Sequence, residues 1–133
     1  MSSQLSDAAK ALIDSPTFAV LGTVEPDGAP HLSVVWVTRD GDELLVSTVE
    51  GRKKHLNLVQ DPRCSILLNP DDAPYTYLEV RGIVTMTKEG GRELIDRLAN
   101  KHHGVDRYTA DDGTDNVRVV VRITPTKIVE RGL

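Results

Sequence analysis

The chain has 133 residues, enough for one domain with a hydrophobic core and too few for two ordinary ones, so we expect a single domain over residues 1–133. Hydrophobic residues make up 39 % and charged residues 27 %, which excludes an intrinsically disordered chain. The formal charge of −4 argues against a general nucleic-acid-binding protein. No run of about twenty apolar residues occurs and the first ten residues lack a signal-peptide core, so we expect a cytoplasmic protein that binds no membrane.

The first part of the chain predicts a short helix followed by strands. Residues 5–14 are amphipathic, with Ser6 in the N-cap position and Ser15-Pro16 at the end of the helix. Two turn sequences, Pro26-Asp27-Gly28 and Asp40-Gly41-Asp42, interrupt the apolar stretch that follows, and the first favours a β-hairpin. The strands expected around these turns are 17–25, 30–38 and 43–49.

A basic triplet lies where the third strand gives way to a helix. Gly51 breaks the strand, and the helix is expected to end at Asp61-Pro62, because proline disfavours helical geometry in the residue before it. Backbone N–H groups, two hydroxyls and three cations at this junction make a candidate anion site. A run of charges is also typical of the solvated side of a helix, so both interpretations stay open here. The side chains concerned are Ser47, Thr48, Arg52, Lys53 and Lys54.

The second part of the chain predicts more strands and one longer helix. Gly82 lies within a long strand and indicates a bulge or bend of the kind that closed sheets need at corners. Leu94, Ile95 and Leu98 fall on one face of the predicted helix. The polar segment 104–115 is expected to be a loop. The expected elements are strands 63–69 and 75–88, a helix over 89–103, and two strands within 116–131 around Pro125.

These elements predict a mainly β fold with short helices (α+β). The helices do not alternate with the strands as parallel crossover units require, so a small antiparallel barrel is favoured over a layered α/β sheet. A barrel of this size fills its interior with side chains. We therefore expect a binding site outside the barrel, in a groove or at a subunit interface.

The single cysteine and the four histidines give little sign of catalysis or metal binding. Cys64 lies in the apolar run 64–68, which favours a small buried side chain over a catalytic nucleophile. His102-His103 is at the end of a predicted helix, His31 and His55 are isolated, and no pair has HExxH spacing. The sequence therefore predicts no metal site.

A hairpin, a strand and several short motifs follow one another in a fixed order: Ser47-Thr48, Gly51-Arg52-Lys53-Lys54, Asn57-Leu58, Asp61-Pro62-Arg63 and Glu79-Val80-Arg81-Gly82. This order resembles the pyridoxamine 5′-phosphate oxidase-like split β-barrel superfamily, and within it the deazaflavin (coenzyme F420)-dependent reductase branch. The resemblance covers residues 8–130, and its most specific parts are 47–63 and 75–82. It implies a split antiparallel β-barrel of the FMN-binding type.

The resemblance also implies which residues bind the cofactor. In such proteins the strand-end hydroxyls and the basic residues after them bind the cofactor phosphate or polar atoms near its ring, which here indicates Ser47, Thr48, Arg52, Lys53 and Lys54. A planar arginine fork and a mobile lysine charge suit a phosphate.

Two aromatic residues complete the set of candidates. Trp36 alternates with Val35 and Val37 along its strand, so it shares a face with Val34. This position is compatible with the core, with a dimer interface and with a place beside a tricyclic ring. Tyr77 matches a family position that reaches the cofactor from the partner subunit, although ordinary packing also suits a tyrosine there.

The resemblance implies an F420-dependent oxidoreductase that transfers a hydride between the cofactor and a flat conjugated small-molecule acceptor. Because the cofactor supplies the chemistry, no catalytic side chain is named. We expect a homodimer with two cofactor grooves. The alternatives are an FMN-binding oxidoreductase of the same fold and a non-enzymatic cofactor or haem-type carrier. Pyridoxamine phosphate oxidation itself is not expected, because the chain stops at 128–133 without the Arg- and Trp-containing tail of that branch. Segments 70–76 and 104–115 are expected to set acceptor choice.

Overall fold

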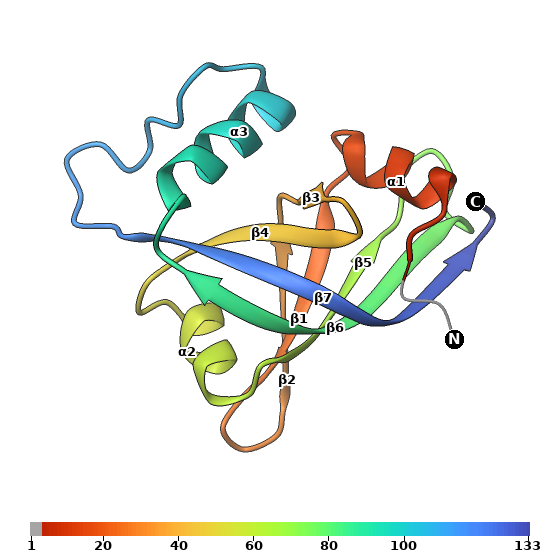
Figure 1. Ribbon diagram of the computed structural model, residues 1–133, viewed down its shortest axis with the longest axis horizontal. Helices are drawn as coiled ribbons and strands as arrows, with labels where there is room; N and C mark the ends of the chain where they lie inside the picture. Colours follow the sequence, from red (N-terminus) through yellow and green to blue (C-terminus); the bar gives the residue numbers. More distant parts are fainter. Residues whose placement is uncertain (1–3) are drawn as a thin grey trace.

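The computed structural model describes residues 4–133; residues 1–3, at the start of the expected domain, lie outside this range. The chain forms one antiparallel sheet with three short helices around it (Figure 1). The helices are α1 (Asp7–Asp14), α2 (Lys53–Gln60) and α3 (Gly91–His103). The strands are β1 (Ala19–Val24), β2 (Pro30–Val35), β3 (Thr38–Asp40), β4 (Glu43–Val49), β5 (Arg63–Leu68), β6 (Tyr77–Thr87) and β7 (Arg118–Arg131).

The strand order in the sheet is β2-β1-β5-β6-β7-β4-β3, and every neighbouring pair is antiparallel. The edge strands β2 and β3 follow each other in the chain and are separated only by Trp36 and Val37. The two edges of the curled sheet therefore meet without pairing, and the barrel is not closed. The predicted split antiparallel barrel with short helices is confirmed.

Alternating side chains of the strands fill the interior of this barrel. In β1 every second residue is buried, as the period of a strand with one covered face requires. The interior includes Leu21, Val46, Ile66 and Val80, and α1 covers it with Ile13. On the other side of β4 and β7, a second cluster packs under α3: Leu45, Leu94, Leu98 and Val120, with Trp36 against it.

Several helix ends and the bulge were predicted correctly from local residues. Ser6 is the N-cap of α1, and its Oγ accepts a hydrogen bond from the Ala9 N–H at 3.0 Å. Ser15 is the C-cap of the same helix. Gly82 marks a β-bulge, because the pairing register between β6 and β7 shifts between Arg81 and Gly82. A Cβ on Gly82 would lie 2.5 Å from the Thr124 carbonyl oxygen, so only glycine fits.

The predicted strands were wrong in two places. The predicted strand 30–38 is broken at Trp36, where the chain crosses from one edge of the sheet to the other. The two strands predicted within 116–131 are one strand, β7. Pro125 does not interrupt β7 because it lies opposite Gly82 at the bulge, where a proline can be accommodated. Among the described residues, no helix is long and apolar enough to cross a membrane.

Candidate anion and cofactor site

The junction between β4 and α2 is a tight turn that presents the start of a helix. Gly51 has a φ of +88°, a conformation that glycine adopts without strain. The Arg52 N–H donates to the Val49 carbonyl at 3.1 Å, and the Gly51 N–H donates to His55 Nδ1 at 3.0 Å. Arg52 is the N-cap of α2, and its side chain makes no capping hydrogen bond. The first N–H groups of α2 are therefore available to a ligand, and the helix dipole favours an anion there.

The basic triplet divides between two surfaces. Arg52 and Lys54 line a pocket of about 220 Å³, whereas Lys53 Nζ pairs with Glu25 Oε2 at 3.0 Å. Burial lowers the pKa of Lys54, and the cations Arg52 and Arg118 lower it further. Within residues 4–133, neither Arg52 nor Lys54 forms an ion pair with a carboxylate. The pocket therefore holds two uncompensated cations, and Lys53 does not add to them.

The two strand-end hydroxyls also separate, because successive side chains of β4 point to opposite faces. Ser47 lines the pocket, and its Oγ accepts a long hydrogen bond of 3.5 Å from Arg118 Nη1. Thr48 is 3 % exposed on the interior side of β4. Its Oγ1 is buried and has no hydrogen-bond partner among the described residues. Ser47, and not Thr48, lies in the same pocket as the cations.

Aromatic rings form the opposite wall of this pocket. Trp36 stacks on His102 with ring centroids 5.4 Å apart and planes at 9°. Tyr108 meets the Trp36 ring edge-on at 5.9 Å and 89°. Val35 and Val37 are buried and Val34 is exposed, as the expected alternation requires. Trp36 thus packs against the cluster under α3 and also lines the pocket.

Two polar side chains that line this pocket, Tyr108 and Arg118, were not predicted from the sequence. Tyr108 comes from the predicted polar loop between α3 and β7, and Arg118 is the first residue of β7. The Arg118 guanidinium lies 4.9 Å from the centroid of the Tyr108 ring. No motif or spacing links these positions to the basic triplet, because the sheet brings them together only in three dimensions. The polar composition of the loop was the one signal available.

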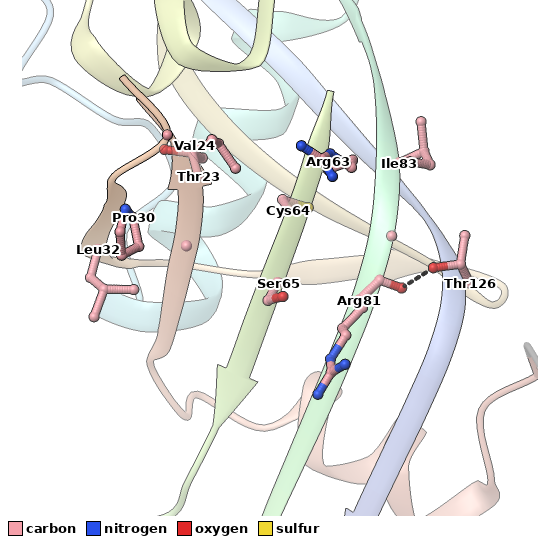
Figure 2. Close-up of a pocket in the computed structure, with 13 residues that line it drawn as sticks. Thr23, Val24, Pro30, Leu32, Arg63, Cys64, Ser65, Arg81, Ile83 and Thr126 are labelled. Atoms are coloured by element: carbon pink, nitrogen blue, oxygen red, sulfur yellow. Dashed lines mark hydrogen bonds between the residues drawn. The ribbon is translucent and has the colours of Figure 1, made fainter. Parts of the chain in front are cut away.

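Tyr77 lies outside this pocket within the single chain. It is the first residue of β6 and lines a hollow of about 280 Å³ on the outer face of the sheet, with Leu32 and Leu67. A larger cavity of about 600 Å³ adjoins that hollow and spans β1, β5 and β6 (Figure 2). None of the residues predicted to bind the cofactor lines the larger cavity.

Cys64 lies beneath this outer cavity with its side chain buried. Burial raises the pKa of its thiol to about 12, so the thiolate required of a nucleophile does not form near neutral pH. This supports the structural interpretation of Cys64. Within residues 4–133, no three His, Cys, Asp or Glu side chains gather as metal ligands.

Comparison with known proteins identifies the family. The family model described as pyridoxamine 5′-phosphate oxidase matches residues 5–131. The chain belongs to this family.

An F420 reductase is 27 % identical with a TM-score of 0.82, over 94 % of this chain and 98 % of that one. The conserved hypothetical protein Rv2991 from Mycobacterium tuberculosis is 25 % identical with a TM-score of 0.77, over 96 % and 84 %. General Stress Protein 26 from Bacillus anthracis, 20 % identical with a TM-score of 0.69 over 91 % and 88 %, shows the fold alone.

Proteins of the pyridoxamine 5′-phosphate oxidase family bind flavin-type cofactors, and the pocket has suitable chemistry for one. Arg52 and Lys54 offer charge to a phosphate, and Trp36 and Tyr108 offer flat surfaces to a ring. Its volume of about 220 Å³ is below the roughly 300 Å³ at which small-molecule pockets begin. A cofactor of this type bound here would therefore extend beyond the pocket over the neighbouring surface.

Proposed function

We propose that this protein is an F420 (deazaflavin)-dependent oxidoreductase that transfers a hydride between the cofactor and a flat conjugated small-molecule acceptor. The observation that carries the proposal is the meeting, in one pocket, of the uncompensated cations Arg52 and Lys54 with the aromatic wall of Trp36 and Tyr108. The likeness to an F420 reductase over nearly the whole of both chains favours this cofactor. FMN is the alternative, because its phosphate suits the same cations.

In this proposal the side chains bind and orient, and do not themselves react. Arg52, Lys54 and the first N–H groups of α2 hold the anionic part of the cofactor, while Trp36 and Tyr108 restrict the plane in which a ring can lie. The bound cofactor supplies the hydride. No carboxylate, histidine or thiol lines this pocket among the described residues, so we assign no catalytic residue and expect solvent to exchange the proton.

We further propose a cytoplasmic homodimer in which the second copy completes the cofactor groove. The outer face of the sheet carries four exposed apolar side chains on β2, β5 and β6, and the pairing registers place them on one side. Val34 belongs both to this face and to the pocket, so the two surfaces are continuous. Tyr77 lies on the same face and is available to a second copy. The four side chains are Leu32, Val34, Leu67 and Ile83.

The test is titration of the purified apoprotein with F420 and with FMN under matched conditions. Trp36 is the only tryptophan and lines the pocket, so its fluorescence reports binding directly. We expect a colourless protein as isolated, quenching by both cofactors and tighter binding of F420. A yellow protein that retains FMN through purification would favour the alternative cofactor. Quenching by neither compound would refute the proposed function.

A further inference from the structure

We propose that Asp111 is a positioning residue for this pocket. It holds Arg118 with one amino group facing the ligand, and it holds the loop whose Tyr108 forms a wall of the pocket. The inference rests on the proposed function in one respect, namely that the pocket binds an anionic ligand. The loop comprises residues 104–117, between α3 and β7. Asp111 belongs to that loop and does not itself line the pocket.

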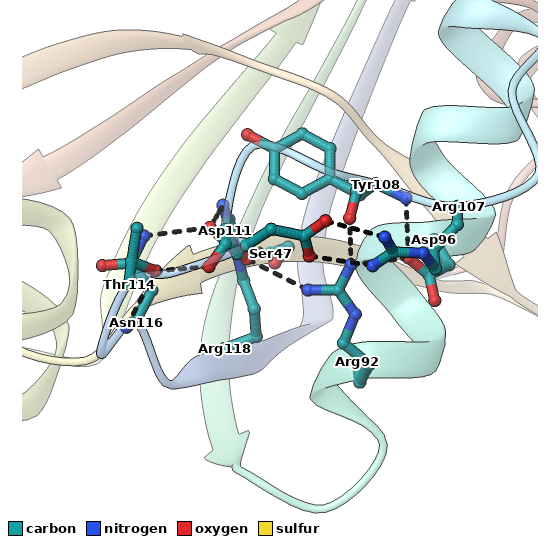
Figure 3. A network of polar contacts seen from close by, with 10 residues as sticks. Ser47, Arg92, Asp96, Arg107, Tyr108, Asp111, Thr114, Asn116 and Arg118 are labelled. Carbon is teal, nitrogen blue, oxygen red and sulfur yellow. Dashed lines mark hydrogen bonds and ion pairs between the residues drawn. The ribbon is translucent and has the colours of Figure 1, made fainter.

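The carboxylate of Asp111 is buried and fully used by its neighbours (Figure 3). Arg118 donates to it through Nε at 2.7 Å and through Nη2 at 3.0 Å, a bidentate pair. Asn116 Nδ2 donates to the same carboxylate at 2.9 Å, and Arg92 Nη1 at 3.3 Å. Four donors on one side chain that is only 6 % exposed fix its position closely.

This arrangement fixes the orientation of the Arg118 guanidinium. Nε and Nη2 each donate to Asp111, and Nη1 lies 3.5 Å from Ser47 Oγ, which lines the pocket. Because the Asp111 carboxylate pairs with the guanidinium, Arg118 offers a ligand a directed N–H donor whose charge is partly compensated. The uncompensated charge of the pocket comes from Arg52 and Lys54.

The same network fixes the aromatic wall. Arg92 connects Asp111 to α3, since Nη2 donates to Asp96 Oδ1 at 2.9 Å and also to the Tyr108 carbonyl oxygen. The Tyr108 N–H donates to the same Asp96 oxygen at 2.8 Å. The Tyr108 ring lies over Arg118, which Asp111 holds. Loss of the Asp111 charge is therefore expected to loosen both the donor and the wall.

Removal of this charge has two expected effects on ligand affinity, and they are opposite in sign, so the experiment distinguishes them. The substitution Asp111→Asn keeps the shape of the side chain and leaves Arg118 uncompensated, which raises the positive charge beside the pocket. If Asp111 acts only through charge, anions should bind more tightly. If Asp111 acts by positioning, binding should weaken in spite of the added charge, by about tenfold or more for a lost charged hydrogen bond.

The experiment compares Asp111→Asn with Asp112→Asn. Asp112 is the adjacent residue, and its carboxylate pairs with Arg107 at 2.7 Å with both side chains about half exposed. Acrylamide quenching of Trp36 is measured without ligand, and binding of F420 and of inorganic phosphate is measured by Trp36 fluorescence. We expect Asp111→Asn to increase acrylamide quenching and to weaken binding of both ligands, while Asp112→Asn matches the unmodified protein. Equal quenching in the two variants, with equal or tighter binding in Asp111→Asn, would overturn the inference.

A second variant keeps the test decisive should Asp111→Asn not fold. Arg118→Lys retains the charge and a partner for Asp111, but one ammonium cannot make a bidentate pair and also reach the pocket. It is expected to weaken ligand binding about tenfold while circular dichroism is retained. Unchanged binding in Arg118→Lys would contradict the inference. If the unmodified protein binds none of the ligands, the proposed function fails, and the acrylamide measurement still decides whether Asp111 holds the wall.

Discussion

Lys53 and Lys54 are adjacent lysines in opposite environments. Lys53 is compensated by Glu25 on the surface of the protein. Lys54 is half-buried in the pocket, where desolvation and two neighbouring cations lower its pKa. An anionic ligand stabilises an ammonium group in this situation, because its opposite charge offsets the lost hydration. The two residues therefore provide a test and a matched control within one helical turn.

Replacement of Lys54 by alanine should weaken cofactor binding and leave the fold intact, because the side chain contributes charge to the pocket and little to the core. A lost charged contact to a phosphate costs about 1.5–3 kcal/mol, which is roughly ten- to a hundredfold in affinity. The difference should shrink at high salt. Titration of Trp36 fluorescence measures it.

Lys53→Ala serves as the control, and its affinity should match that of the unmodified protein, because the Lys53 charge is directed to Glu25. Unchanged affinity in both Arg52→Ala and Lys54→Ala would mean that the basic triplet is a solvated face, and the anion site would then be wrong.

The bulge between β6 and β7 is the element on which the curvature of the sheet depends. The register passes from Arg81 opposite Lys127 to Gly82 opposite Pro125, so that Thr126 is unpaired. Gly82→Ala should destabilise the protein by about 1–3 kcal/mol, because its Cβ would lie 2.5 Å from a backbone oxygen that cannot move alone. Gly22→Ala is the control, since its Cβ would lie 3.2 Å from the flexible end of Leu32 and 3.6 Å, an ordinary contact distance, from the Ser65 carbonyl oxygen. Equal midpoints of urea unfolding for the two variants would contradict this account of the bulge.

The loop 104–117 should make stability sensitive to acid through Asp111. Its hydrogen bonds from Arg118 lower the pKa of Asp111 from 3.8 to about 2 in the folded protein. Because the folded-state pKa is below the unfolded-state pKa, ionised Asp111 stabilises the fold at pH values above the unfolded-state pKa. This contribution to the free energy of unfolding, about 2 kcal/mol, is lost as the pH falls from about 4 to about 2. Asp111→Asn should therefore be less stable at pH 6 and lose less stability between pH 5 and pH 2. The measurement is urea unfolding of both proteins at each pH. An equal loss of stability in the variant and the unmodified protein would argue against this contribution.

Elements with local signals could be predicted, and elements set by distant partners could not. Ser6 and Gly82 carry their own chemistry, as a cap and as a residue without Cβ, and both predictions are confirmed. Pro125 was predicted to divide two strands because the register shift that accommodates it, with Thr126 unpaired beside it, depends on pairing with β6, a strand distant in the sequence. The break at Trp36 reflects where the two sheet edges meet, which depends on the whole strand order.

The cations and the aromatic wall of the pocket come from three segments that are far apart in the sequence: the end of β2, the junction of β4 with α2, and the loop with the start of β7. The first two segments contain Trp36, Arg52 and Lys54, which were predicted to bind the cofactor and do line one pocket. Period-2 alternation already implied that Ser47 and Thr48 face opposite sides of β4. Arg118 and Tyr108 had no such signal, because only the folded sheet places them here.

The apolar outer face leads to a prediction about assembly. Leu32 is 68 % exposed and Val34 69 %, which is unusual for neighbouring positions on one strand face of a monomer. Leu32→Glu should shift the protein from dimer to monomer in sedimentation and weaken cofactor binding, because each groove would lose its second copy. Val105→Glu, on the loop after α3, adds the same charge elsewhere and should leave the dimer intact. A protein that is already monomeric at micromolar concentration and binds cofactor at full strength would contradict this prediction.

The protein should catalyse the oxidation of reduced F420 by an acceptor when both are supplied. The acceptor is expected to be a flat conjugated compound, such as a quinone, an enone or a tetrapyrrole-like molecule, since a hydride leaving the face of a planar ring requires an acceptor lying parallel at about 3–3.5 Å. Chelators should leave the rate unchanged. Arg52→Ala should raise the KM for cofactor and nearly keep kcat, because Arg52 contributes binding that is equal in ground and transition states, and Lys53→Ala should change neither. Oxidation of the cofactor is followed by its absorbance. Tight binding of reduced F420 without oxidation across a broad acceptor panel would instead support a carrier that holds the cofactor without turnover.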